Sequence, residues 1–150
     1  MSPRCPAAAA LLALALSPLG ACTTFGFGRP VEVEHETHLT PSGIELVDLR
    51  HGKGAPAIHG TLVRVHYVAR LEDGVAFDSS YDRGLPEEFV LGAGRVIVGW
   101  EEGMLGMREG GRRRMRIPSE LAYGAEGLGD LIPPDSVLEL EVELLRVKRP

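Results

Sequence analysis

The segment 137–147 constrains the fold of this chain more than any other, because its side chains alternate between apolar and acidic over residues 138–144. The apolar positions are Leu138, Leu140, Val142 and Leu144, and the acidic positions between them are Glu139, Glu141 and Glu143. Successive side chains of a strand point to opposite faces of a sheet, so this pattern predicts a strand buried on one face and solvated on the other. Such a strand belongs in an antiparallel sheet that covers a core on one side only.

A second long alternation runs through residues 62–72, and Asp73-Gly74 follows it directly. One face of this predicted strand carries Val63, Val65, Tyr67, Ala69 and Leu71. An Asp-Gly pair between two alternating segments is a strong signal for a β-hairpin. Four shorter segments also fit strands, namely residues 43–50, 75–77, 88–91 and 112–117.

Residues 98–107 have the spacing of a helix, with apolar side chains at 100, 104, 105 and 107, and Gly110-Gly111 ends the pattern. A helix this short depends on tertiary packing for its stability. A set of strands with one short helix predicts an α+β fold, in which a curved antiparallel sheet wraps around the helix.

The run Arg112-Arg113-Arg114 lies on one of the predicted strands, so its side chains alternate between the two faces. The glutamates of segment 137–147 offer cross-strand partners, and we therefore expect solvated salt bridges, with polyanion binding as the alternative. The chain holds 16 Lys and Arg against 21 Asp and Glu, a net charge of −5. A protein with this balance has no electrostatic reason to bind nucleic acid, and we expect no such partner.

Residues 1–21 have the pattern of a secretory signal peptide, with a basic Arg4, an Ala- and Leu-rich run over residues 7–16 and small residues at 20–21. The apolar run is too short to span a bilayer as a helix, which takes about 20 residues. The alternative is a buried N-terminal helix, which Pro18 would interrupt.

The sequence Leu19-Gly20-Ala21-Cys22 resembles the lipobox of bacterial lipoproteins, in which the peptide is cut before a cysteine that carries lipid. Several acyl chains on one residue give stable anchoring, so the resemblance implies a membrane anchor at Cys22. The alternative is a free or disulfide-bonded cysteine, but the other cysteine, Cys5, would leave with the signal peptide.

Residues 22–40 mix Gly, Pro and charged residues without a sustained period, and we interpret them as a lipid-anchored tether. Val31 and Val33 alternate with acids, so an edge strand in this segment is the alternative. The folded domain then covers residues 41–150.

The sequence lacks the common motifs of nucleophilic, metal and nucleotide chemistry: it contains no GxSxG, HExxH, CxxC or P-loop. We therefore predict no metal and no cofactor. His35 and His38 lie in a segment without helical pattern, which argues against a metal site there. His66 points away from the face that carries Tyr67, so we interpret it as structural.

Several blocks, in order and over about residues 41–148, resemble the FKBP-type peptidyl-prolyl cis-trans isomerase family. They are Val65-His66-Tyr67, Leu71-Glu72-Asp73-Gly74, Phe77-Asp78-Ser79-Ser80, Phe89-Val90-Leu91-Gly92, Val96-Ile97-Val98-Gly99-Trp100-Glu101, Gly106-Met107, Leu121-Ala122-Tyr123-Gly124, Ile132-Pro133-Pro134 and Val142-Glu143-Leu144-Leu145. The resemblance implies a half-barrel of antiparallel strands around a short helix, with a shallow apolar pocket between sheet and helix that binds a proline ring.

Matched position by position, the resemblance assigns catalytic roles to Asp78, Tyr123 and Trp100, with Trp100 as the pocket floor. It assigns substrate binding to Tyr67, Phe77, Arg83, Phe89, Val96, Ile97, Leu131, Ile132 and Leu140. The Ile97 amide and the Tyr123 hydroxyl would donate hydrogen bonds to a bound ligand, and Arg83 would pair with Asp78.

Four positions depart from the pattern of well-known single-domain members. Glu87 and Leu140 stand where an aromatic ring is common, Leu128 where an aromatic or His is common, and Arg95 where an acid or amide is common. These departures bear on substrate preference and macrolide affinity more than on the fold.

The expected function is rotation of X-Pro bonds in exported proteins, with proline-containing polypeptides as substrates and macrolides as inhibitors. The alternatives are a proline-peptide binding module or holdase chaperone with little turnover, and a structural envelope lipoprotein without a pocket. We expect a monomer on the periplasmic face of a bacterial membrane. The outer membrane is favoured over the inner because Thr23, rather than Asp, follows Cys22.

Overall fold

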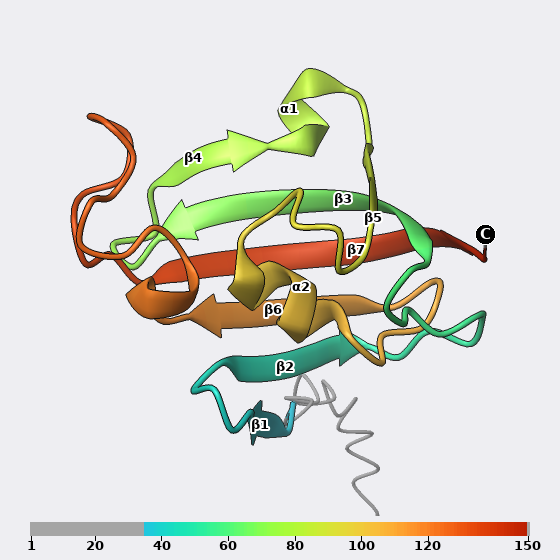
Figure 1. The fold of residues 1–150 in the computed structure, drawn as a ribbon. Coiled ribbons are helices and arrows are strands. Elements are labelled where there is room, and N and C mark those ends of the chain that lie inside the picture. Colours follow the sequence, from blue (N-terminus) through green and yellow to red (C-terminus); the bar gives the residue numbers. More distant parts are fainter. Residues whose placement is uncertain (1–34, 150) are drawn as a thin grey trace, which may run out of the picture. The chain divides into compact units, whose positions relative to one another are not determined.

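A computed structural model describes residues 35–149, which form one curved antiparallel sheet with a short helix on its concave face (Figure 1). The strands are β1 (Thr37–Leu39), β2 (Glu45–Arg50), β3 (Leu62–Leu71), β4 (Ala76–Ser79), β5 (Glu87–Val90), β6 (Arg112–Ile117) and β7 (Leu138–Lys148). The helices are α1 (Ser80–Arg83), α2 (Val98–Met104) and a 3₁₀ turn, η1 (Ser119–Leu121). The predicted α+β class and its curved sheet are confirmed. The predicted signal peptide, Cys22 and most of the tether lie outside the described residues.

The strand order is β1-β2-β6-β7-β3-β4, with β5 on the same edge of β3 as β4. β3 and β7 pair along their whole length, from Leu62 opposite Lys148 to Leu71 opposite Leu138. The apolar positions of both predicted alternations are buried apart from Leu71, which is half-buried. The longest strands therefore lie where the two clearest sequence patterns placed them.

The edge of β3 is covered by two short strands with the helix α1 between them, an element that the sequence patterns did not predict. Ser80, the first residue of α1, is fully buried, and its hydroxyl accepts the Tyr67 amide over 2.8 Å. This hydroxyl replaces the strand partner that β3 lacks at Tyr67. Ser79 caps the start of α1 and Gly84 ends it with φ of 67°, so the chain turns sharply there.

The helix α2 lies against β6, and two glycines allow the close approach. A Cβ on Gly99 would lie 2.2 Å from Ile117 Cγ2, and one on Gly103 would lie 2.3 Å from Met115 Sδ. The helix is shorter than predicted, because Leu105 leaves the helical region at ψ of 133° and Gly106 follows with φ of 79°.

The end of α2 is held by Arg113, which points inward rather than into solvent. Its guanidinium donates to the Gly103 carbonyl over 2.8 Å and to both carboxylate oxygens of Asp48, over 2.6 and 3.0 Å. Burial would raise the pKa of Asp48, but the bonds and charge of Arg113 outweigh it and lower that pKa. The expected solvated pairing is therefore wrong for Arg113. It is right for Arg112 and Arg114, which both pair with Glu141.

The first strand, β1, pairs with β2 from Thr37 opposite Val47 to Leu39 opposite Glu45. A tight turn makes this possible, since the Gly43 amide donates to the Thr40 carbonyl over 2.9 Å. Residues 37–39, predicted as tether, thus belong to the sheet. No helix among the described residues is long and apolar enough to cross a membrane.

Replacing Gly99 by Ala is expected to lower the free energy of unfolding by about 1–3 kcal/mol, because the added methyl meets the stiff, β-branched Ile117. Gly103→Ala is the matched control: its methyl meets the end of the flexible Met115 side chain, and Ala favours helix over Gly by about 1 kcal/mol. Urea unfolding of both variants measures the difference. Equal losses, or a larger loss for Gly103→Ala, would contradict this packing.

Candidate active site

A cleft of about 350 Å³ opens between the concave face of the sheet and α2. Its lining residues come from β3, β4, α1, β5, the loop before α2, α2 itself, the segment after η1, and β7. They are Tyr67, Ala69, Phe77, Asp78, Arg83, Glu87, Arg95, Val96, Ile97, Trp100, Tyr123, Leu138 and Leu140. Segments far apart in the sequence therefore meet here.

The floor of the cleft is the indole of Trp100, which is 8% exposed. Tyr67 and Phe89 meet it edge to face, with ring centroids 4.6 and 5.5 Å away. The indole N–H donates to Met104 Sδ over 3.0 Å, one turn along α2. The polar atom of the ring is thus engaged within the helix, and an apolar ring surface is left toward the cleft.

One corner of the cleft is polar. The Tyr67 hydroxyl donates to Asp78 Oδ2 over 2.5 Å, and Arg83 donates both to that hydroxyl, over 2.9 Å, and to Asp78 Oδ1. Burial, and next the carboxylate of Asp78, raise the pKa of Tyr67 to about 12. Bonds to Tyr67 and Asp78 likewise raise the pKa of Arg83. Around neutral pH the Tyr67 hydroxyl therefore keeps its proton and Arg83 its charge.

Local structure explains this corner. Ser80 fixes the β3 backbone at Tyr67, and the single turn of α1 carries Arg83 back over the Tyr67 ring, 5.5 Å from its centroid. Glu87 of β5 approaches the same guanidinium at 3.8 Å. The interruption of the sheet edge by α1 is thus what places a charged pair beside the aromatic floor.

Two donors at the cleft are available to a ligand. Within residues 35–149 neither the Ile97 amide nor the Tyr123 hydroxyl donates a hydrogen bond to the protein. Both residues are half-buried and line the cleft. Metal-ligating side chains do not gather in groups of three or more anywhere in the described residues.

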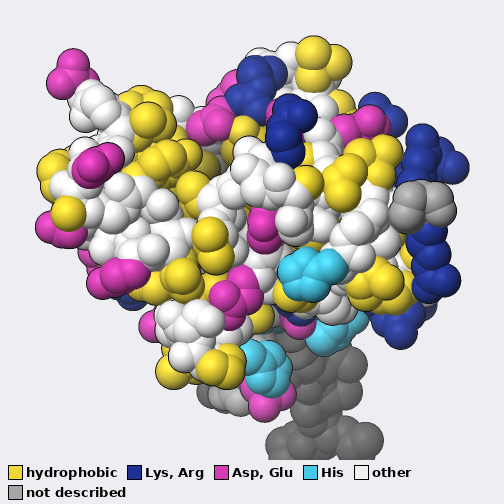
Figure 2. Space-filling view, viewed as in Figure 1, with side chains coloured by type: hydrophobic (Ala, Val, Ile, Leu, Met, Phe, Trp, Pro, Cys, Tyr) yellow, Lys and Arg dark blue, Asp and Glu magenta, His cyan; other side chains and the backbone are white. Residues whose placement is uncertain are grey.

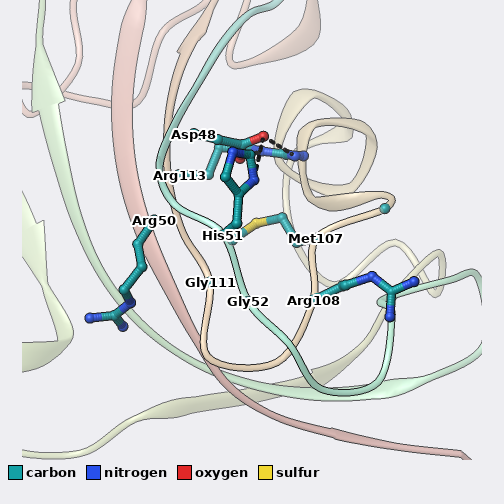
Figure 3. A pocket seen from close by; sticks show the side chains of 9 residues that line it. Asp48, Arg50, His51, Gly52, Met107, Arg108, Gly111 and Arg113 are labelled. Atoms are coloured by element: carbon teal, nitrogen blue, oxygen red, sulfur yellow. Dashed lines mark hydrogen bonds and ion pairs between the residues drawn. The ribbon is translucent and has the colours of Figure 1, made fainter. Parts of the chain in front are cut away.

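A second hollow, of about 160 Å³, lies beside β2 and the loop before β6 (Figure 3). Figure 3 shows Asp48, His51 and Arg113 turned toward one another, while Arg50 and Arg108 point away. Arg113 and Asp48 already bind each other, and no Phe, Tyr or Trp side chain lines this hollow. Its groups serve the packing of α2, so the aromatic cleft is the candidate active site.

Comparison with known proteins identifies the family. The family model of FKBP-type peptidyl-prolyl cis-trans isomerase matches residues 54–145, which contain every residue of the cleft. This chain belongs to that family.

The FKBP-type isomerases similar to it include the FK506-binding protein of Neisseria meningitidis serogroup B, which is 51% identical over 105 residues. That alignment covers 70% of this chain and 96% of the relative. Peptidyl-prolyl cis-trans isomerase FKBP13 of Arabidopsis thaliana is 46% identical over 121 residues, covering 73% of this chain and 58% of the relative.

Solved FKBP structures share the fold. The crystal structure of AtFKBP13 superposes with a TM-score of 0.71 at 44% identity, covering 75% of this chain and 99% of that one. FkpA from Escherichia coli gives a TM-score of 0.70 at 41% identity, covering 75% of this chain and 52% of that one. The chain is thus an FKBP-type peptidyl-prolyl cis-trans isomerase, as its motifs indicated.

Most of the FKBP site residues predicted from the sequence lie together in the cleft. Three do not line it. Phe89 lies behind Trp100, in the core; Ile132 is 1% exposed, and Leu131 is 50% exposed. The loop after η1 folds back on itself, with Leu128 bridged to Ile132, which turns Ile132 inward and leaves Leu131 at the surface. Figure 2 shows apolar side chains exposed at the left of the molecule, where this loop lies.

Four cleft residues were not among the predicted site residues: Ala69, Leu138, Glu87 and Arg95. Ala69 and Leu138 share the buried faces of β3 and β7 with Tyr67 and Leu140, so strand alternation could have found them. Glu87 and Arg95 stand at positions noted as departures from the family, and no local pattern marks them as lining residues.

Proposed function

We propose that this isomerase seats the proline ring of its substrate on Trp100 and twists the preceding peptide bond across the cleft, without proton transfer. One observation carries this proposal. An apolar aromatic floor, a charged corner and two available hydrogen-bond donors lie together in a single cleft. A proline ring is apolar and has no N–H, so it suits a floor that offers ring surface and no polar group.

Amide physics explains how such a cleft accelerates rotation. The barrier to peptide-bond rotation is about 18–20 kcal/mol, because resonance holds the amide planar. Resonance also separates charge, so the twisted amide is less polar than the planar one. Moving the twisted amide from water into an apolar cleft therefore costs less free energy than moving the planar amide. Binding the transition state better than the ground state is what raises the rate.

The polar groups act by holding the twisted chain. The Ile97 amide and the Tyr123 hydroxyl donate to carbonyl groups of the substrate on either side of the proline. Asp78, held by Tyr67 and Arg83, presents a fixed charge beside the rotating bond. Since these groups are fixed before the substrate arrives, little reorganisation is needed as the bond rotates.

The rim of the cleft shapes what else it accepts. Glu87, Arg95 and Leu140, three of the four departures from the family pattern, line the cleft, whereas Leu128 is 45% exposed and does not. We infer that macrolides bind this cleft in competition with proline peptides. Their affinity depends on the charged side chains of Glu87 and Arg95 at the rim.

Removing the Asp78 carboxylate is expected to lower kcat/KM for a proline tetrapeptide by about 10- to 100-fold, because hydrogen bonds to a charged group are worth about 1.5–3 kcal/mol. Tyr123→Phe is expected to lower it only about 2- to 10-fold, since one neutral hydrogen bond is worth about 0.5–1.5 kcal/mol. A protease-coupled exchange assay measures both.

Asp82→Ala is the matched control for Asp78→Ala, because Asp82 is an exposed acid on α1, four residues after Asp78, and does not line the cleft. It should retain full activity. If Asp78→Ala keeps full activity with an unchanged melting temperature, the role given to Asp78 is wrong.

We also propose that the enzyme is a lipoprotein that assists the folding of exported proteins. The supporting feature is the Leu19-Gly20-Ala21-Cys22 sequence at the end of a signal-peptide pattern. Uncatalysed X-Pro exchange takes tens to hundreds of seconds at about 25 °C, slow enough to limit folding after export. The absence of an Asp after Cys22 favours the outer membrane.

The anchor is tested by the mass of the protein extracted from the membranes of a bacterial host. The chain should begin at Cys22 and carry the added mass of its acyl groups, and Cys22→Ser should lose that addition. The matched control, Cys5→Ser, should keep the added mass, because Cys5 leaves with the signal peptide. A Cys22→Ser protein that still carries the same added mass would refute the lipobox.

A further inference from the structure

On the outer face of the sheet, side chains of opposite charge lie side by side in one half but not in the other. In the paired half, the register places Glu139 between Arg116 and Arg70, and Glu141 beside Arg114. Glu141 forms ion pairs with two arginines of β6, as described above. Each acid of β7 therefore lies beside cations of its neighbours, as favourable cross-strand pairing requires.

The pattern reverses at the other end of the same strands. Beyond Glu143 the register shifts, and Arg146 of β7 lies directly opposite Arg64 of β3, while Lys148 lies opposite Leu62. Like charges opposite one another on neighbouring strands destabilise a sheet. The opposed Arg64 and Arg146 therefore present positive charge at this end of β3 and β7.

We call this region the basic edge: Arg64, Arg146, Lys148 and Arg149. The first three line one shallow cleft together with Leu62 and Glu88. Figure 2 shows dark-blue side chains gathered at the right of the molecule, beside the C-terminus, and several acidic side chains at the left. In this view, the basic side chains at the right lie apart from the acidic side chains at the left.

Two carboxylates lie close to the basic edge and both are engaged. Glu88 pairs with Arg64 at 3.4 Å, and Glu109 accepts the Val147 amide over 2.9 Å. Within residues 35–149, Arg146, Lys148 and Arg149 form no ion pair. Four cations against two carboxylates leave a surplus of positive charge, on a chain whose net charge is −5.

Apolar side chains accompany these cations. Val90, opposite Leu62 on β5, is 39% exposed, and Leu145 is 36% exposed. Cations on long stems beside exposed aliphatic side chains suit the boundary between lipid headgroups and acyl chains. Nucleic acid would instead require stacking aromatic side chains or many more cations.

We propose that the basic edge docks on the anionic headgroups of a lipid bilayer. Docking there orients the enzyme. The cleft lies toward the other end of β3 and β7: Leu140 lines the cleft and Arg146 is six residues further along β7, about 20 Å at the rise of a strand. A domain resting on its basic edge keeps the cleft open to polypeptides in solution.

Vesicle binding of the mature chain, residues 22–150 carrying Cys22→Ser, tests this proposal without the signal peptide and the lipid anchor. The protein is sedimented with vesicles of phosphatidylcholine alone or of phosphatidylcholine mixed with phosphatidylglycerol. We expect stronger binding to the anionic vesicles, and high salt should remove the difference. Adding Arg146→Gln and Lys148→Gln should weaken anionic binding about 30-fold, because each cation near such a surface contributes about 1 kcal/mol.

The matched control adds Arg70→Gln and Arg116→Gln, which change the net charge equally at the other end of the same face. Equal losses in both double variants, or equal binding to neutral and anionic vesicles, would overturn the proposal. Tighter binding to duplex DNA than to anionic vesicles would overturn it too. Full isomerase activity of the Arg146→Gln, Lys148→Gln variant shows that it is folded. Failure of the docking proposal leaves the proposed catalytic mechanism and lipid anchor untouched.

Discussion

The antiparallel pairing of β3 with β7 is the interaction on which the rest of the structure depends. These strands contribute their buried faces to the core, and both hold cleft residues near one end. Trp100 lies over these faces because α2 packs its two glycines on β6, the next strand. The same ladder carries the basic edge at its far end. Cleft and basic edge are thus held at a fixed separation by one pair of strands.

The sequence predicts the parts of the fold that follow from strand alternation and turn chemistry. Residues 62–72 and 137–147 alternate over enough positions to fix which face is buried, and Asp73-Gly74 fixes the hairpin. Family motifs then predict Trp100, Tyr67 and Asp78 as neighbours, which strand periodicity alone could not do, because they lie on three different elements.

The parts that could not be predicted depend on contacts between distant residues. The helix α1 has four residues and no periodicity; it is fixed by Ser80 hydrogen-bonding the backbone of Tyr67, 13 positions away. In the sequence, nothing distinguishes Arg113 from Arg112 and Arg114. The structure shows that its buried guanidinium binds Asp48 and the end of α2. The burial of Ile132 rather than its exposure to the cleft depends on how one loop folds back.

The chemistry of the cleft follows from which groups hold their protons. Burial and Asp78 keep the Tyr67 hydroxyl protonated, with a pKa of about 12, so it serves as a donor and not as a base. His66 lies on the outer face, where its ring stacks on Tyr81 at 4.4 Å and its Nδ1 is 2.9 Å from the Ser80 hydroxyl. The cleft therefore has a fixed polar corner and an apolar floor, and His66 does not line it.

The measurement that tests this mechanism most directly is the pH dependence of kcat/KM for a proline tetrapeptide, for the enzyme and for His66→Gln. If desolvation and twisting carry catalysis, the rate is nearly flat between about pH 6 and 9 in both proteins, since no proton moves in the slow step. If His66 acted as a base, the acid limb of the pH profile would fall about tenfold for each pH unit. An acid limb of that slope in the enzyme, abolished in His66→Gln, would contradict the mechanism proposed for the cleft.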